Sequence, residues 1–173
     1  METRRFARFS LLIGSLLTTA LHATQAVSEC PDNANRALIE KLFYQGFSGG
    51  VISVLEEVFD ENIEFHDPAF PPGIEGIKQL VAKNNQSFEN WHFTIHEMLC
   101  DGSDRVVVRW NGNGIHVRSW MGEPPTGNTV DLNGISIYQI EGNKVTADWV
   151  VPDNLGFLMQ IGVLAPMDLT KEK

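Results

Sequence analysis

The stretch Trp149-Val150-Val151-Pro152-Asp153-Asn154-Leu155-Gly156 marks the point where the most regular pattern in this chain changes from strand to helix. Upstream, Val130–Ile140 and Val145–Val151 are rich in β-branched and aromatic residues, and residues 141–144 have the composition of a tight turn. These segments predict a β-hairpin. Downstream of Asp153, apolar residues recur at helical spacing as far as Gly162 and predict a short helix.

Asp153 lies where the second strand of this hairpin ends and the apolar helix begins. A carboxylate in that place is typical of a helix N-cap, because it accepts hydrogen bonds from unpaired backbone N–H groups. The same carboxylate is equally well placed to act as an acid/base group in a pocket roofed by the helix. Trp149 shares strand parity with Asp153, so a strand that stays regular through Pro152 would direct both side chains into one cavity.

The rest of the chain supplies further helices and strands. Helical spacing predicts one helix from Asp32 or Asn33 to about Ser48, one over Val51–Phe59 and one over Ile74–Phe88, and strand patterns cover Glu61–His66, a segment beginning at Trp91, and Arg105–Val117. Phe43 and Phe47, at the end of the first helix, would form a wall or lid. Helices early and long strands late predict an α+β fold, a curved antiparallel sheet wrapped around helices.

Length and charge narrow the class of protein. The 173 residues, 43% of them hydrophobic, suit one domain with its own core, and the formal net charge is −9. With that charge and no basic cluster after the N-terminus, nucleic acid is not an expected partner.

The N-terminus has the pattern of a secretory signal peptide over residues 1–26, which leaves residues 27–173 as the mature domain. A basic start is followed by an apolar run over Phe9–Leu21 and by small residues before Val27. The run is short for a membrane span, so we expect a secreted or periplasmic protein with no stable membrane insertion once the leader is removed.

The two cysteines of the chain, Cys30 and Cys100, both belong to the predicted mature domain. Export would permit a disulfide between them, which would attach the mature N-terminus to the strand that carries Cys100. Two free thiols, with Cys100 buried, are the alternative that the sequence leaves open.

Several kinds of active site are not indicated by the sequence. The segment from His96 to Cys100 resembles a zinc-protease helix only superficially, because it lacks a second histidine and alternates like a strand. No Gly-x-Ser-x-Gly motif and no glycine-rich phosphate loop occurs. We therefore predict no metal site.

The groups that remain point to proton-transfer chemistry. His66 closes a predicted strand just before the rigid loop at residues 67–73, and an imidazole there can relay a proton beside a carbonyl group. Asp67 precedes a proline and is either part of a turn motif or a pocket residue. His116 shares strand parity with Trp110 and is either a pocket residue or a surface residue.

Three blocks of sequence carry a resemblance to a known family. They are Phe65-His66-Asp67-Pro68 with Pro71 to Gly76, then Met121 to Gly127, then Trp149 to Asp153 with Leu155 to Gly162. In this order and spacing, over about Asn33 to Gly162, the chain resembles the SnoaL-like polyketide cyclase, or ester cyclase, group of the NTF2-like superfamily.

The resemblance implies a fold and a chemistry. The fold would be a cone, in which a strongly curved, mainly antiparallel sheet wraps around three helices and encloses an apolar cavity. The chemistry would be acid/base catalysis without a cofactor, such as an intramolecular aldol condensation. Asp153 matches the family's catalytic aspartate by its place after the tryptophan, and His66 matches a pocket histidine. Trp149, Asp67, His116 and Phe47 would contact the substrate.

Three positions depart from the family pattern. Ser136 stands where an aspartate is frequent, Asp148 where a histidine often precedes the tryptophan, and Gln139 where an arginine is frequent. These changes would alter the polarity of the pocket or of the outer surface. They leave the fold assignment intact, but they mean that the fold alone does not establish cyclase activity.

Two hypotheses of function follow from these patterns. The first is an exported enzyme of cyclase or isomerase type that acts on a small hydrophobic carbonyl compound. The second is a non-catalytic protein that binds a small hydrophobic molecule in the same cavity. A homodimer formed through the outer face of the sheet is a further expectation.

Overall fold

The computed structural model of this chain describes residues 28–30, 34–65, 70–101 and 104–165. The predicted signal peptide over residues 1–26 lies outside these residues, and so do two of the predicted site residues, His66 and Asp67. Within the described residues, no helix has both the length and the apolar character that crossing a membrane would require.

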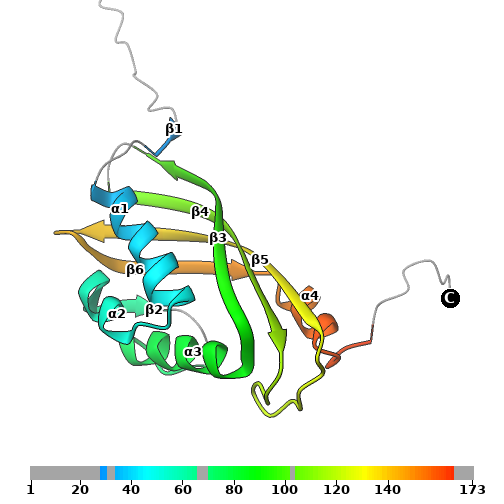
Figure 1. The fold of residues 1–173 in the computed structure, drawn as a ribbon. Helices are drawn as coiled ribbons and strands as arrows, with labels where there is room; N and C mark the ends of the chain where they lie inside the picture. Colours follow the sequence, from blue (N-terminus) through cyan, green and yellow to red (C-terminus); the bar gives the residue numbers. More distant parts are fainter. Residues whose placement is uncertain (1–27, 31–33, 66–69, 102–103, 166–173) are drawn as a thin grey trace, which may run out of the picture.

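One six-stranded sheet forms the body of the fold (Figure 1). Its strands, in spatial order, are β1 (Ser28–Glu29), β3 (Phe88–Cys100), β4 (Arg105–His116), β5 (Thr129–Glu141), β6 (Lys144–Pro152) and β2 (Phe59–Phe65). Every neighbouring pair is antiparallel except β2 and β6, which run parallel. The predicted hairpin is confirmed as β5 and β6, and the two-residue strand β1 is an element that the sequence patterns did not indicate.

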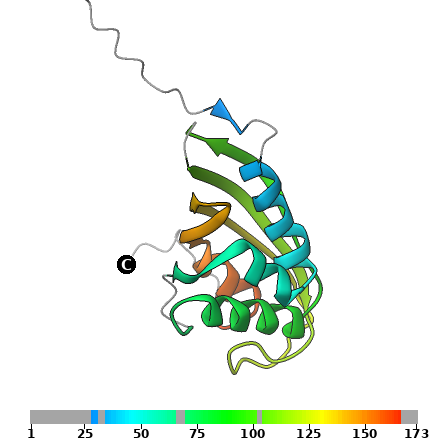
Figure 2. The same ribbon diagram turned by 90° about the vertical axis from the view of Figure 1, so that its left-hand side faces the viewer.

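The helices lie on the concave face of the sheet, which bends around them (Figures 1 and 2). Helix α1 (Ala34–Lys41) continues directly into the π-helical segment η1 (Leu42–Ser48), so the two form one helix that ends at Ser48 as predicted. Helix α2 (Ile52–Val58) and helix α3 (Ile74–Ser87) follow, and helix α4 (Asn154–Gln160) covers one end of the sheet. The α+β fold, with three helices inside a curved sheet, agrees with the prediction.

A disulfide joins Cys30 to Cys100, across 70 residues of sequence. It attaches the short strand β1 to the end of β3, where the two strands pair in antiparallel register. Of the two possibilities that the sequence left open for these cysteines, the structure therefore contains the bridge. Such a link restricts the unfolded chain and so stabilises the folded one.

A β-bulge in β6 decides which side chains face the helices. Residues Gln139 and Ile140 are adjacent in β5, but they pair with Ala147 and Val145, so Thr146 is an extra residue in β6. The inward positions are odd-numbered before the bulge and even-numbered after it. Val145 is therefore buried opposite Ile140, and the next inward positions are 148, 150 and 152.

Candidate active site

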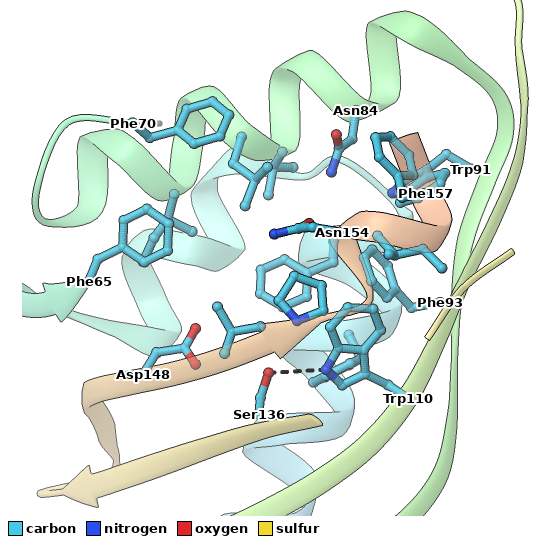
Figure 3. A pocket seen from close by; sticks show the side chains of 18 of the residues that line it. Phe65, Phe70, Asn84, Trp91, Phe93, Trp110, Ser136, Asp148, Asn154 and Phe157 are labelled. Carbon is cyan, nitrogen blue, oxygen red and sulfur yellow. Dashed lines mark hydrogen bonds between the residues drawn. The ribbon is translucent and has the colours of Figure 1, made fainter. Parts of the chain in front are cut away.

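An apolar cavity of about 320 Å³ lies between the concave face of the sheet and the helices. Helix α3 covers one side of it and the first turn of α4 lies across its end (Figure 3). Six phenylalanines line it, namely Phe43, Phe47, Phe65, Phe70, Phe93 and Phe157. Phe47, which the sequence predicted to contact the substrate, is part of this wall, where its ring packs against Phe43 and Phe93 at centroid distances of 5.4 and 5.6 Å.

Two indole rings form flat parts of the wall because the neighbouring strand positions are glycines. A Cβ atom at Gly134 would lie 2.3 Å from Cζ2 of Trp110, and one at Gly114 would lie 2.8 Å from Cε3 of Trp91. Gly112 and Gly114 lie in β4, whose pairing with β5 is continuous, while the irregularities lie in β3. These glycines make room for Trp91.

Asp148 is the acidic side chain that lines this cavity (Figure 3). It lies on β6 beyond the bulge, is 5% exposed, and its Oδ1 atom has no hydrogen-bond partner among the described residues. Burial disfavours the charged form and raises the pKa of this carboxyl from its ordinary 3.8 to about 7. At neutral pH the group therefore exists in both protonation states, as a general acid/base requires.

Tyr138 and Ser136 on β5 continue the polar part of the wall. Tyr138 pairs directly with Asp148 across the two strands, and Ser136 lies one inward position further along, where its Oγ accepts a hydrogen bond of 3.0 Å from Nε1 of Trp110. Burial, and after it the negative charge of Asp148, raises the pKa of Tyr138 well above its ordinary 10. The phenol therefore remains protonated beside the carboxyl group.

The sequence model of one family, SnoaL-like polyketide cyclase, matches residues 37–161. The chain belongs to the SnoaL-like polyketide cyclase family. The family resemblance inferred from the three sequence blocks is thereby confirmed.

Solved structures agree with this assignment. The structure of TsrD from Streptomyces laurentii is 24% identical with a TM-score of 0.71, and the match covers 79% of this chain and 100% of that one. A candidate polyketide cyclase from Acidithiobacillus ferrooxidans is 25% identical with a TM-score of 0.67, and the match covers 79% and 99% of the two chains. A comparison with curated proteins found no match.

In this SnoaL-like protein, Asp153 lies outside the cavity. It is exposed and borders a shallow hollow on the outer face together with Arg109, Ile135 and Val151. Its Oδ1 accepts a 2.9 Å hydrogen bond from the backbone N–H of Gly156, so Asp153 caps helix α4. The N-cap interpretation is therefore confirmed, and the expectation that Asp153 lies in a pocket is corrected.

Trp149 is also on the outer face, and 41% of its surface is exposed. Its register partner in β5 is Ile137, which is exposed as well. The strand is regular from Trp149 to Pro152, as the prediction assumed, but the bulge at Thr146 places Trp149 on the outer face, so the prediction that it lines the cavity is wrong.

His116 is completely buried but does not line the cavity. Its Nδ1 lies 3.2 Å from Oγ1 of Thr126, and its ring packs against Phe88 at a centroid distance of 5.2 Å. Phe88 belongs to the cluster of apolar residues under α4. His116 is thus a core residue, and the expectation of substrate contact is not met.

Sequence reasoning treated Asp148 only as a departure from the family pattern, and the structure makes it the central polar group of the cavity. The sequence does contain one signal, because Asp148 is a charged residue between Ala147 and Trp149 in a strand that is mostly apolar. Within the described residues, no cluster of three or more His, Cys, Asp or Glu side chains has the geometry of a metal site.

Proposed function

We propose that this protein is an exported acid/base enzyme of cyclase or isomerase type that acts without a cofactor on a small hydrophobic carbonyl compound. The observation that carries the proposal is Asp148, a nearly buried carboxyl group with a pKa of about 7 and an unpartnered oxygen in an apolar cavity. Membership of the SnoaL-like family supports chemistry of this type.

The reaction needs one group that removes a proton and returns it. The carboxylate of Asp148 takes a proton from a carbon atom next to a carbonyl group, which leaves an enolate. The enolate carbon attacks a second carbonyl of the same molecule, and a C–C bond forms. The resulting alkoxide takes the proton back from the Asp148 carboxyl, so the product has the mass of the substrate and the enzyme returns to its starting state.

The surroundings of Asp148 favour this role. The apolar wall makes a charge in the cavity costly, so burial raises the pKa of the Asp148 carboxyl and makes its carboxylate a stronger base than one in water. Tyr138, opposite Asp148 and protonated, is placed to donate a hydrogen bond to a developing oxyanion. His66, which the sequence assigned a relay role, stays a proposal, and its neighbour Phe65 pairs with Asp148.

Export is proposed from the signal pattern over residues 1–26. The Cys30–Cys100 disulfide supports it, since structural disulfides persist in oxidising compartments. The test is N-terminal sequencing of protein recovered from the cell exterior or periplasm. A sequence beginning at Val27 is expected, and an intact Met1 on cytoplasmic protein would contradict the proposal.

The function is tested by incubating the protein with a metabolite extract from its source and following the extract by mass spectrometry. Asp148→Asn is run in parallel, with Asp153→Asn as the matched control. Conversion of one compound to another of equal mass by the wild type and the control, but not by Asp148→Asn, is the expected result. A product that differs from its substrate by the mass of one water would instead indicate hydration or dehydration at Asp148.

The same experiment distinguishes an enzyme from a binding protein. A compound that all three proteins retain and release unchanged would contradict the catalytic proposal and make the cavity a carrier site. Asp148 would then be an anchor for the ligand.

We propose also that two copies associate through the outer face of the sheet. Ile135, Ile137, Trp149 and Val151 form a contiguous apolar patch there, because Ile135 pairs with Val151 and Ile137 with Trp149. Val151 is 74% exposed, and patches of this kind mark protein contacts. Sedimentation of the wild type as a dimer and of Val151→Lys as a monomer would support this, and a monomeric wild type would contradict it.

A further inference from the structure

The cavity has a second polar end, away from Asp148, where Trp91 lines its wall (Figure 3). Trp91 is 6% exposed, and its Nε1 atom has no hydrogen-bond partner among the described residues. The ring is held in place by Phe88, at a centroid distance of 4.9 Å, and by Gly112 and Gly114, which leave no room for a side chain beneath it. A buried indole N–H without a partner is costly, and it can only donate.

Asn84 of α3 adds a second donor at this end. Its Oδ1 accepts a 3.0 Å hydrogen bond from Nε1 of Trp120. This bond orients the amide, so its NH₂ group points into the cavity, as Figure 3 shows. Trp120 and Trp91 belong to one group of packed aromatic rings. The ring centroids of Trp120 and Phe157 are 4.8 Å apart, those of Phe157 and Phe88 are 5.9 Å apart, and Phe88 packs on Trp91. Two fixed donors therefore face the cavity from the same end.

The charges on the wall decide which acceptor these donors suit. Among the described residues, the lining contains no Lys, Arg or His, and its ionisable side chains are Asp148 and Tyr138. Both of these become negative when they ionise. A carboxylate or phosphate on the ligand would bring a charge without a counter-cation into an apolar cavity whose own ionisable groups have the same sign.

We propose that Trp91 and Asn84 bind a neutral carbonyl oxygen of the substrate, such as that of a ketone, ester or lactone, while the reacting carbon lies at Asp148. The substrate then has two oxygen-bearing ends joined by an apolar body, and free acids are excluded. This inference rests on the proposed function in that it takes the same cavity as the site.

Three naphthalene probes test the proposal on the full chain by isothermal titration calorimetry at pH 8. They are 2-acetylnaphthalene, its carbon isostere 2-isopropenylnaphthalene, and 2-naphthoate. The ketone is expected to bind roughly 3–10-fold more tightly than the isostere, the effect of one hydrogen bond to a neutral acceptor. The anion is expected to bind at least about tenfold more weakly than the ketone.

Two variants assign the effect to Trp91. Trp91→Phe should reduce the difference between ketone and isostere to the part that the amide of Asn84 contributes. Trp110→Phe is the matched control, because it removes an indole whose N–H is already bonded to Ser136, and it should preserve the ratio. In ¹⁵N-labelled protein, the indole resonance that Trp91→Phe removes should shift downfield with the ketone relative to the isostere, a comparison that cancels the ring current of the probe.

Equal binding of ketone and isostere would overturn the proposal, as would no binding of either probe or an equal loss for both in Trp91→Phe. Naphthoate binding as tightly as the ketone would overturn the exclusion of anions. The outcome is separable from that of the proposed function, because Asp148→Asn should keep the ketone preference while it loses turnover. A confirmed preference in a protein without turnover would contradict only the catalytic proposal.

Discussion

Asp148 and Asp153 lie on opposite sides of the sheet, although they are only five positions apart in the sequence. Asp148 is 5% exposed and faces the cavity beside Tyr138, whereas Asp153 is exposed and caps α4 through Gly156. One carboxyl group therefore has a pKa near neutrality and the other stabilises a helix end. Their substitutions should have separate consequences.

Asp148→Asn should lower turnover of the substrate by roughly 10²–10⁴-fold, because it removes the group that moves the proton. If the carboxylate acts as the base, the wild-type rate should rise with pH through about 7. Steady-state rates between pH 5 and 9 measure both effects. Asp153→Asn, which keeps an N-cap side chain, should leave the rate and its pH profile unchanged, and equal losses in the two variants would refute this division of roles.

Asp148→Asn should also change how stability depends on pH. Because the pKa of Asp148 is raised, the folded state keeps a proton that the unfolded state releases above pH 3.8. The stability that this protonated carboxyl contributes is therefore complete below pH 3.8 and is lost as the pH rises to about 7. The rise of the pKa from 3.8 to about 7 corresponds to about 4 kcal/mol of free energy of unfolding. Urea unfolding should show the wild type losing stability between pH 4 and 8, and the variant losing less. If the stability of the two proteins changed with pH in parallel, the raised pKa of the Asp148 carboxyl would be contradicted.

Asp153→Ala should destabilise the protein by about 1 kcal/mol, because the backbone N–H of Gly156 loses its acceptor. Thermal unfolding followed by circular dichroism measures the change. Asp153→Asn is the control and should restore most of the loss. An equally unstable asparagine variant would show that the charge of Asp153, acting on the helix dipole, matters more than the cap.

Gly134→Ala should cost roughly 1–3 kcal/mol, the usual effect of adding atoms to a packed site. Its new Cβ would meet the indole of Trp110, which would have to leave its place and break its bond to Ser136. Urea unfolding measures the loss, and a change in Trp110 fluorescence should accompany it. Ile135→Ala, at the neighbouring outward position, should change the stability of the monomer far less. Similar losses for both variants would contradict the close packing of Trp110 on Gly134.

The sequence alone located nearly all the elements, because their signals are local. Alternation and helical spacing predicted the β5–β6 hairpin and helix α3 to within a residue or two at each end. The two-residue strand β1 escaped prediction because its pairing with β3 depends on the distant Cys100. The wall position of Phe47 followed from its place at the end of the first helix.

The inward face of β6 was decided only by the tertiary structure. Val145, Ala147, Trp149 and Val151 alternate so regularly that the sequence favours an inward odd-numbered face. The pairing of Ile140 with Val145 and of Tyr138 with Asp148 requires an extra residue between them, and that bulge places Asp148 in the cavity and leaves Trp149 outside. Sequence thus determined the family, the order of elements and the apolar character of the cavity. The register between two strands, which no local pattern encodes, determined which carboxyl group the cavity contains.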